Sequence, residues 1–283
     1  MWRSVVLRPA FALAVVLIAA ILVPVVLMPA PALAGFPRRL EYTGAGSATP
    51  EEILQQAAEK LATVGDLAAP RRASRSTGWY IQVEYGADGE PKVPPYISPQ
   101  TIEVQWNEDL SGRVTTRAEV PYTSDGSSVP DDAVPAGEVV SDVRYSAGDF
   151  SVPFTTVPGN GPQDMVDALE ASGAGLGESG ARTIDAMTNL LGFWTLNATQ
   201  MGYLLGILAA KGDLVYLGST TDRRGRPVDG IAAVNADAKT RTTLLLSTRT
   251  GLPVAWELEL LSELDGIPQG TITIYTLWKD SNE

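Results

Sequence analysis

The sequence predicts an α+β fold, in which one apolar N-terminal helix precedes a domain with a curved antiparallel sheet. Three observations predict it. The first is a run without charged residues from Pro9 to Pro37. The second is alternation of apolar and polar residues with a period of two, in segments on both sides of a central region. The third is a helical period in that central region, and helices grouped between groups of strands are typical of the α+β class.

The apolar run is long enough to cross a bilayer. Phe11–Met28 is almost all Ala, Val, Leu and Ile, and about 20 such residues span the hydrocarbon core. We expect residues 9–28 to be a single-pass membrane anchor after a short cytoplasmic tail, residues 1–8, with the bulk of the chain outside the cytoplasm. The alternative is a signal peptide cleaved at Ala34, which closes an A-x-A sequence, and a secreted product.

The chain after the anchor is expected to hold a tether and one domain. Residues 29–50 are rich in proline and glycine, and residues 51–283 are the extracytoplasmic α+β domain. The domain opens with a helix, because Thr49 is a suitable N-cap and Pro50 suits the first turn. Its apolar residues recur at helical spacing: Ile53, Leu54, Ala57, Ala58, Leu61 and Val64.

Strands are expected next. Trp79–Tyr85 and Thr101–Trp106 alternate between apolar and polar residues, which is typical of half-buried antiparallel strands. A third strand is expected at Val114–Val120. Residues Tyr122–Asp149 are rich in Ser, Asp, Gly and Pro and are interpreted as a long surface loop.

The helical period then returns in Gln163–Ala171, Ser179–Phe193 and Ala198–Lys211. The last part of the chain predicts five short strands joined by tight turns, which favours an antiparallel meander. These strands are Asp213–Ser219, Pro227–Asn235, Lys239–Ser247, Pro253–Ser262 and Thr271–Lys279.

Composition excludes several function classes. The chain has no cysteine and no histidine, so disulfides, thiol nucleophiles, imidazole metal ligands and Ser-His-Asp triads are impossible. Its 33 acidic residues outnumber 21 basic ones, for a net charge of −12, which disfavours a nucleic-acid partner. We expect no cofactor, no metal and no catalytic residue, and we interpret the acidic residues as solvated (Asp131, Asp132, Asp164, Asp167 and Glu170).

Four tryptophans fall on the apolar faces of predicted strands: Trp79, Trp106, Trp256 and Trp278. They are the candidate ligand-binding residues, as the lining of a hydrophobic pocket for an acyl chain or a lipidated peptide. The alternative is an ordinary core beneath the three central helices. Glu257 and Glu259 alternate with Trp256 and are expected to face the other way, so that Glu257→Ala is harmless.

A basic turn, Arg223–Arg226, connects two of the last strands. We interpret it as a solvated hairpin turn, and the alternative is contact with anionic lipid headgroups.

Several short segments together carry a resemblance. They include a T-G-L-P turn at Thr250–Pro253, PRRLEYTG at Pro37–Gly44, EEILQQAAEKLA at Glu51–Ala62 and GDLVYLGSTTDRRGRPVDGIAAV at Gly212–Val234. The chain resembles the lipoprotein-carrier and sigma-factor-regulatory lipoprotein (LolA/RseB-like) fold. More closely, it is similar to uncharacterised actinobacterial single-pass membrane proteins found near sigma factors. The resemblance implies a half-barrel with helices packed on its inner face.

These observations favour a membrane-anchored extracytoplasmic binding or sensing domain without catalysis. Its expected partners are the lipid bilayer, through residues 9–28, and a hydrophobic ligand, a lipoprotein or another envelope protein. One alternative is a purely structural or interaction domain whose core is filled by its own side chains. Another is a carboxylate-based envelope hydrolase.

Overall fold

The computed structural model describes residues 35–279, apart from residues 45, 64–69, 82–83, 86–90, 93–95, 174–176, 178 and 265–266. The expected tail, the expected anchor at residues 9–28 and the possible cleavage site at Ala34 lie outside the described residues. No helix within the described ranges is long and apolar enough to cross a membrane.

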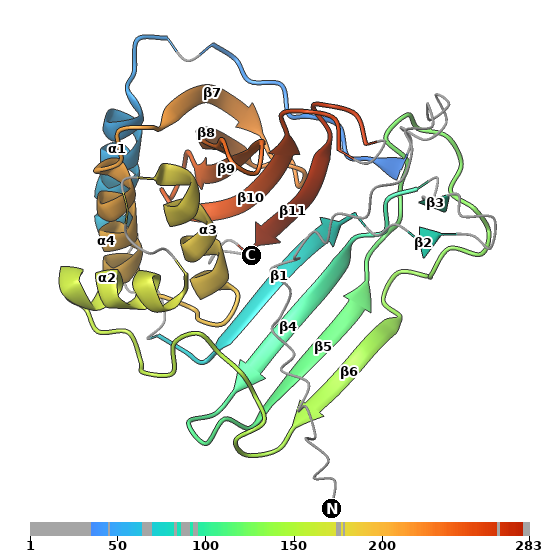
Figure 1. The fold of residues 1–283 in the computed structure, drawn as a ribbon, viewed down its shortest axis with the longest axis horizontal. Helices are drawn as coiled ribbons and strands as arrows, with labels where there is room; N and C mark the ends of the chain where they lie inside the picture. Colours follow the sequence, from blue (N-terminus) through green and yellow to red (C-terminus); the bar gives the residue numbers. More distant parts are fainter. Residues whose placement is uncertain are drawn as a thin grey trace, which may run out of the picture.

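One large open sheet dominates the fold (Figure 1). Its strand order is β6-β5-β4-β1-β11-β10-β9-β8-β7, and every neighbouring pair is antiparallel. The strands are β1 (Ala73–Tyr80), β4 (Gln100–Trp106), β5 (Gly112–Ala118), β6 (Val139–Tyr145), β7 (Val215–Thr221), β8 (Pro227–Asn235), β9 (Thr240–Ser247), β10 (Pro253–Leu260) and β11 (Ile272–Trp278). A separate small sheet pairs β2 (Glu84–Tyr85) with β3 (Pro91–Lys92).

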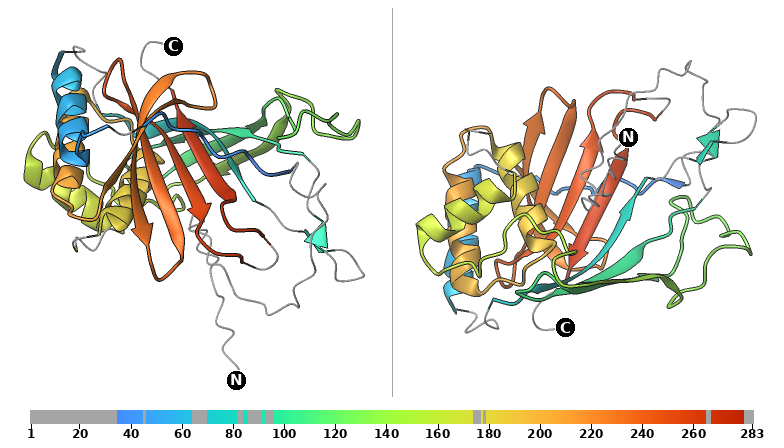
Figure 2. Two further views of the ribbon diagram at one scale, coloured as in Figure 1. Left: turned by 90° about the horizontal axis from the view of Figure 1, so that it is seen from above. Right: turned by 60° about the horizontal axis from the view of Figure 1, so that its bottom comes forward.

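Four helices pack together at one side of this sheet, and α3 makes most of their contact with it: α1 (Pro50–Thr63), α2 (Pro162–Ala171), α3 (Gly180–Leu191) and α4 (Ala198–Ala209). α3 lies on β8 and β9, and α1 runs along α4. Figure 2 shows the helices gathered at one side, while β4, β5 and β6 extend away from them. The predicted α+β class is therefore confirmed, as an open antiparallel sheet with packed helices.

The start of α1 is the capping arrangement that the sequence predicts. The Glu52 backbone N–H donates to Thr49 Oγ1 at 3.2 Å, and the Thr49 N–H donates to the Glu52 carboxylate at 2.9 Å. Two backbone donors without partners in the helix are thus satisfied reciprocally. The apolar stripe is buried at Ile53, Leu54, Ala57 and Leu61.

Two expectations about strands are wrong: the bounds of the first strand, and the interpretation of Tyr122–Asp149 as a loop without a strand. β1 begins at Ala73, earlier than expected, and ends at Tyr80. Its polar first half is accommodated because the Ser74 hydroxyl donates to the Gly192 carbonyl at the end of α3. The expected surface loop contains β6, which pairs with β5. β6 lacks an alternating pattern because both of its faces are largely exposed, so its valines gave no periodic signal.

The strand register divides the side chains between two faces of the sheet. We call the face that carries α3 the inner face, since Thr242 of β9 donates a hydrogen bond from there to Asp185 of α3. The opposite, outer face is covered over its β7–β11 half by residues 36–43 and by the β7–β8 turn. Tyr42, for example, packs on Gly230 of β8, where a Cβ atom would come within 2.5 Å of the tyrosine ring.

Candidate functional site

Trp106, one of the four candidate tryptophans, is a core residue. Only 4% of it is exposed, and its indole N–H donates to the Phe193 carbonyl at 3.0 Å. Its ring meets Trp194 edge to face, with 5.0 Å between the centroids. Because its ring is packed inside the core and its N–H already has an acceptor, Trp106 has neither surface nor a free donor for a ligand.

Trp79 and Trp278 are also buried, and Trp79 lies on the outer face. Trp79 pairs with Tyr275 across the β1–β11 ladder and stacks on its ring, with 6.3 Å between the centroids. Trp256 pairs with Thr276, the next residue of β11, so Trp79 and Trp256 are on opposite faces. The four tryptophans therefore do not converge on one pocket.

Trp256 is the half-buried member of the set, and it stands beside α3 on the inner face. Its indole N–H donates to Thr242 Oγ1 at 2.5 Å, and the Thr242 hydroxyl donates to the Asp185 carboxylate at 3.2 Å. Desolvation by the surrounding protein raises the pKa of Asp185 to about 6, and the hydrogen bond from Thr242 opposes this rise. No described cation contributes to that pKa.

Beyond α3, the inner face carries a strip of apolar side chains that are not fully buried. The register places them on one face, because Leu258 pairs with Ile274, Ile274 with Tyr80, and Val114 with Val143. Tyr80 is 43% exposed and Val143 is 41% exposed. We call this set the inner strip, and its members are Trp256, Leu258, Ile274, Tyr80, Ile102, Val114 and Val143.

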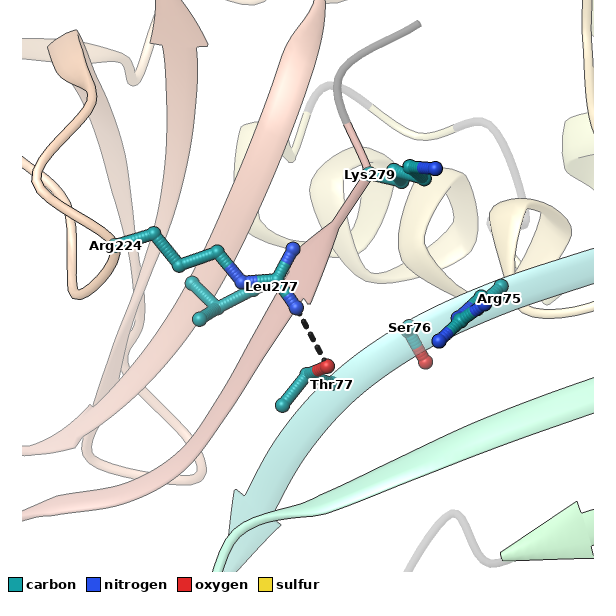
Figure 3. A pocket seen from close by; sticks show the side chains of 6 residues that line it. All are labelled: Arg75, Ser76, Thr77, Arg224, Leu277 and Lys279. Atoms are coloured by element: carbon teal, nitrogen blue, oxygen red, sulfur yellow. Dashed lines mark hydrogen bonds between the residues drawn. The ribbon is translucent and has the colours of Figure 1, made fainter. Parts of the chain in front are cut away.

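Two small, partly open pockets lie in the described part of the chain, and neither is lined by any of the four tryptophans. One, of about 110 Å³, lies between Arg224, Thr77 and Lys279 (Figure 3). There the Arg224 guanidinium donates to Thr77 Oγ1 at 2.6 Å. The other, of about 120 Å³, lies beneath Arg39 and Tyr42 on the outer face. Both are below the ~300–1,000 Å³ of typical small-molecule pockets.

The outer face of β9 and β10 carries buried charge, which corrects one expectation. Glu257 is 4% exposed and accepts from Arg223 Nε at 2.8 Å. Glu259 accepts from Arg241 and forms an ion pair with Arg39 at 3.1 Å. Glu257 therefore faces away from Trp256 as predicted, but it enters a covered ion pair, so Glu257→Ala cannot be harmless.

The basic turn between β7 and β8 folds inward, so its interpretation as a solvated turn is wrong. Arg223 also stacks on the Tyr275 ring, 4.8 Å from its centroid. Arg226 pairs with buried Asp222 at 2.6 Å and donates to the carbonyls of Val254 and Trp278. The turn thus joins the edge of the sheet to its middle strands. Sequence reasoning missed this because the curl of the sheet, which sets what the turn meets, leaves no local signal.

Burial governs the titration of this region. Desolvation raises the pKa of Glu257, and the charge and hydrogen bond of Arg223 oppose that rise. Desolvation likewise raises the pKa values of Tyr42 and Tyr275 well above the ordinary tyrosine range. The ion pairs hold the outer covering on the sheet, and we assign them a structural role.

The acidic residues flagged in the sequence form no reactive pair. Asp164 accepts from the Gly161 N–H at 2.8 Å and caps α2, and Asp167 accepts from Gln163 at 2.8 Å. Asp131 and Asp132 are exposed. Within the described ranges there is no group of three acidic side chains placed to hold a metal ion.

Comparison with known proteins gives only distant likenesses. The sequence matches no family model and no curated protein. Three solved structures of MucB are similar: MucB itself at 16% identity and a TM-score of 0.30, MucB in complex with MucA(peri) at 14% and 0.28, and the Pseudomonas aeruginosa MucA/MucB complex at 13% and 0.26. The likeness covers 81–83% of this chain but only 53–58% of those chains, so the chain spans just over half of their length.

TM-scores this low do not establish a common fold. The architecture above therefore follows from the strand order and packing of this chain alone. The actinobacterial grouping and the single-pass anchor stay predictions.

Proposed function

We propose that this chain is a non-catalytic binding or sensing domain, and that the inner strip is its binding surface. The observation that carries the proposal is the half-exposed apolar surface that crosses β10, β11, β1, β4, β5 and β6 beside α3. Apolar side chains gathered on one face of a soluble domain are typical of interaction surfaces. A surface of this shape suits an extended apolar occupant better than a compact small molecule, because the two pockets described above are small.

The proposed occupant is a hydrophobic ligand, or an apolar segment of a lipoprotein or other envelope protein. Trp256 supplies a large, rigid contact area whose orientation is fixed by its hydrogen bond to Thr242. Asp185 stands at the helix side of the strip and can pair with a basic group on the occupant. MucB is known in complex with MucA; a protein partner for this chain is proposed from the inner strip and not from that likeness.

The occupant can be tested on the full-length chain reconstituted in lipid nanodiscs. A fatty acid bearing a photoreactive diazirine should label residues of the inner strip, as mapped by mass spectrometry. Tyr80→Ser should lower this labelling severalfold. The matched control is Val234→Ser, which changes a side chain of similar exposure (48%) on the outer face. Labelling spread evenly over both faces would refute a binding surface on the inner face.

We also propose that the domain acts outside the cytoplasm, held by residues 9–28. The charge-free run supports an anchor. Cell fractionation should leave the protein in the membrane pellet after a carbonate wash, with its C-terminus open to external protease. A soluble product that begins at Gly35 would instead show cleavage at Ala34.

A further inference from the structure

The two margins of the large sheet are treated differently. At β7, residues 41–43 cover the edge: the Thr43 N–H donates to the Ser219 carbonyl at 2.8 Å, and the Ser219 N–H donates back at 3.3 Å. Gly218 permits this approach, since its φ is +106° and a Cβ there would lie 2.3 Å from the Thr43 oxygen. At the other margin, no described segment pairs with the side of β6 that faces away from β5.

The free edge has the properties of a pairing strand. β6 is rich in strand-forming residues, and Val139, Val140 and Val143 are 45%, 48% and 41% exposed. It contains no proline and no lysine, which are common means of protecting sheet edges, and its two charged residues are of opposite sign, Asp142 and Arg144. Figure 1 shows it at the margin of the sheet, on the side away from the helices.

The charges on β6 are unbalanced within one molecule. Asp142 accepts a two-pronged pair of hydrogen bonds from Arg113 of β5, both at 2.7 Å. Arg144 lies directly opposite Arg113 in the register, on the same face. Like charges in that position repel each other. Among the described residues Arg144 has no carboxylate within ion-pair distance, and its interaction with Asp142 is a longer-range one that helps to lower the pKa of Asp142. The edge therefore lacks one acidic group opposite Arg144.

A second copy of the same strand supplies that group. Two antiparallel β6 strands centred on Val143 place Asp142 of each copy opposite Arg144 of the other. Registers centred on Asp142 or on Arg144 would place like charges face to face. We propose that the chain forms a two-fold dimer by pairing β6 with β6 about Val143, which makes one sheet continuous through both molecules.

The pairing is expected to be reversible. A single seven-residue edge buries less than the ~1,600 Å² of a standard stable interface. The fraction of the chain in dimers should therefore rise with protein concentration. The two-fold arrangement is isologous and closes on itself, because each β6 has only one free edge.

Cysteine crosslinking tests the register directly, since the full-length chain contains no cysteine. In the full-length chain in detergent, Val143→Cys should form a disulfide-linked dimer under mild oxidation, because the two introduced thiols face each other. Ser141→Cys is the matched control: it lies on the same strand and face, but its counterpart in the other copy is four residues away along the pairing. Equal crosslinking of both variants, or none in either, would overturn the proposal.

A charge exchange tests the recognition. In the Val143→Cys background, Arg144→Asp should slow crosslinking about tenfold, because both intermolecular charge pairs become like-charge pairs. The same change keeps the fold intact, since the new carboxylate lies opposite Arg113. The double variant D142R/R144D should restore crosslinking. Arg117→Asp, an equal charge change on the neighbouring strand, should leave it unaltered; an Arg144→Asp variant that crosslinks at the original rate would refute the pairing.

Discussion

The two halves of the sheet differ in what covers them. β9 is buried along almost its whole length, because α3 lies on its inner face and residues 36–43 lie on its outer face. β6 is exposed along almost its whole length. The covered half holds charged groups in buried pairs, whereas the open half leaves apolar groups in water. Buried ion pairs are therefore concentrated in β7–β11, and exposure is greatest at β6, the far end of the open half.

Removing Arg223 should break the covered half most severely. Arg223→Ala leaves the carboxylate of Glu257 buried without its partner, and such a change costs about 3–5 kcal/mol of the free energy of unfolding. Urea unfolding of the full-length chain measures it. Arg113→Ala removes an exposed pair in the open half and should shift the midpoint little. Equal shifts in the two variants would contradict the division of the sheet into a covered and an open half.

The tryptophans show that each half also has exceptions: Trp106 of β4, in the open half, is a core residue, whereas Trp256 of β10, in the covered half, is half-buried on the inner strip. Trp106→Ala creates a cavity in the core and should lower the free energy of unfolding by about 3–5 kcal/mol. Trp256→Ala removes a half-exposed ring and should cost clearly less, while it reduces labelling of the inner strip by the fatty-acid probe. If Trp256→Ala destabilises as much as Trp106→Ala and leaves labelling intact, Trp256 is core and the proposed binding surface loses its centre.

The T-G-L-P turn provides a test of backbone strain. Gly251 has a φ of +75°, as its place in the turn predicts, and a Cβ there would lie 2.0 Å from the Ala57 carbonyl oxygen of α1. Gly251→Val should cost at least about 1–3 kcal/mol, seen as a lower melting temperature. Gly212→Val, at a site with no neighbour within 4 Å, is the control. An unchanged melting temperature for Gly251→Val would show that α1 does not rest on this turn.

The smallest effect is expected from Asp185. Its pKa in the folded state, about 6, is above the ordinary value, so the folded state binds its proton more tightly than the unfolded state does. The protein should therefore lose some stability as the pH rises from about 4 to about 6. Asp185→Asn should abolish that dependence and melt slightly higher at pH 7, with a gain reduced by solvent screening. Melting curves at pH 4 and pH 7 measure it; identical pH dependence in both proteins would rule it out.

Sequence patterns predict those elements whose caps, turns and apolar spacing all lie within a short stretch of consecutive residues. The meander strands were found because their apolar residues and tight turns are local, and β8 was predicted with its observed bounds. α1 was found because its cap and its apolar stripe are read from consecutive residues. β6 was missed because a strand exposed on both faces carries no period-two pattern.

The candidate site was predictable only in part. The sequence places Trp256 and Glu257 on opposite faces correctly, since strand alternation fixes this. It could not show that the outer face is covered, because the covering comes from residues 36–43 and from the distant β7–β8 turn. It also could not place Trp79 on the outer face, since the relation between β1 and β11 depends on pairing across nearly two hundred residues.

The covered edge at β7 also determines how the domain would bear load. The segment that crosses it is fastened at several points: Thr43 to Ser219, the Glu41 carbonyl to Thr220, and Arg39 to Glu259. A pull on the chain ahead of Phe36 would meet these contacts before it reached α1. If the chain is anchored through its N-terminus, tension from the membrane would act first on these contacts with the outer face. They would have to break before the force could unwind α1.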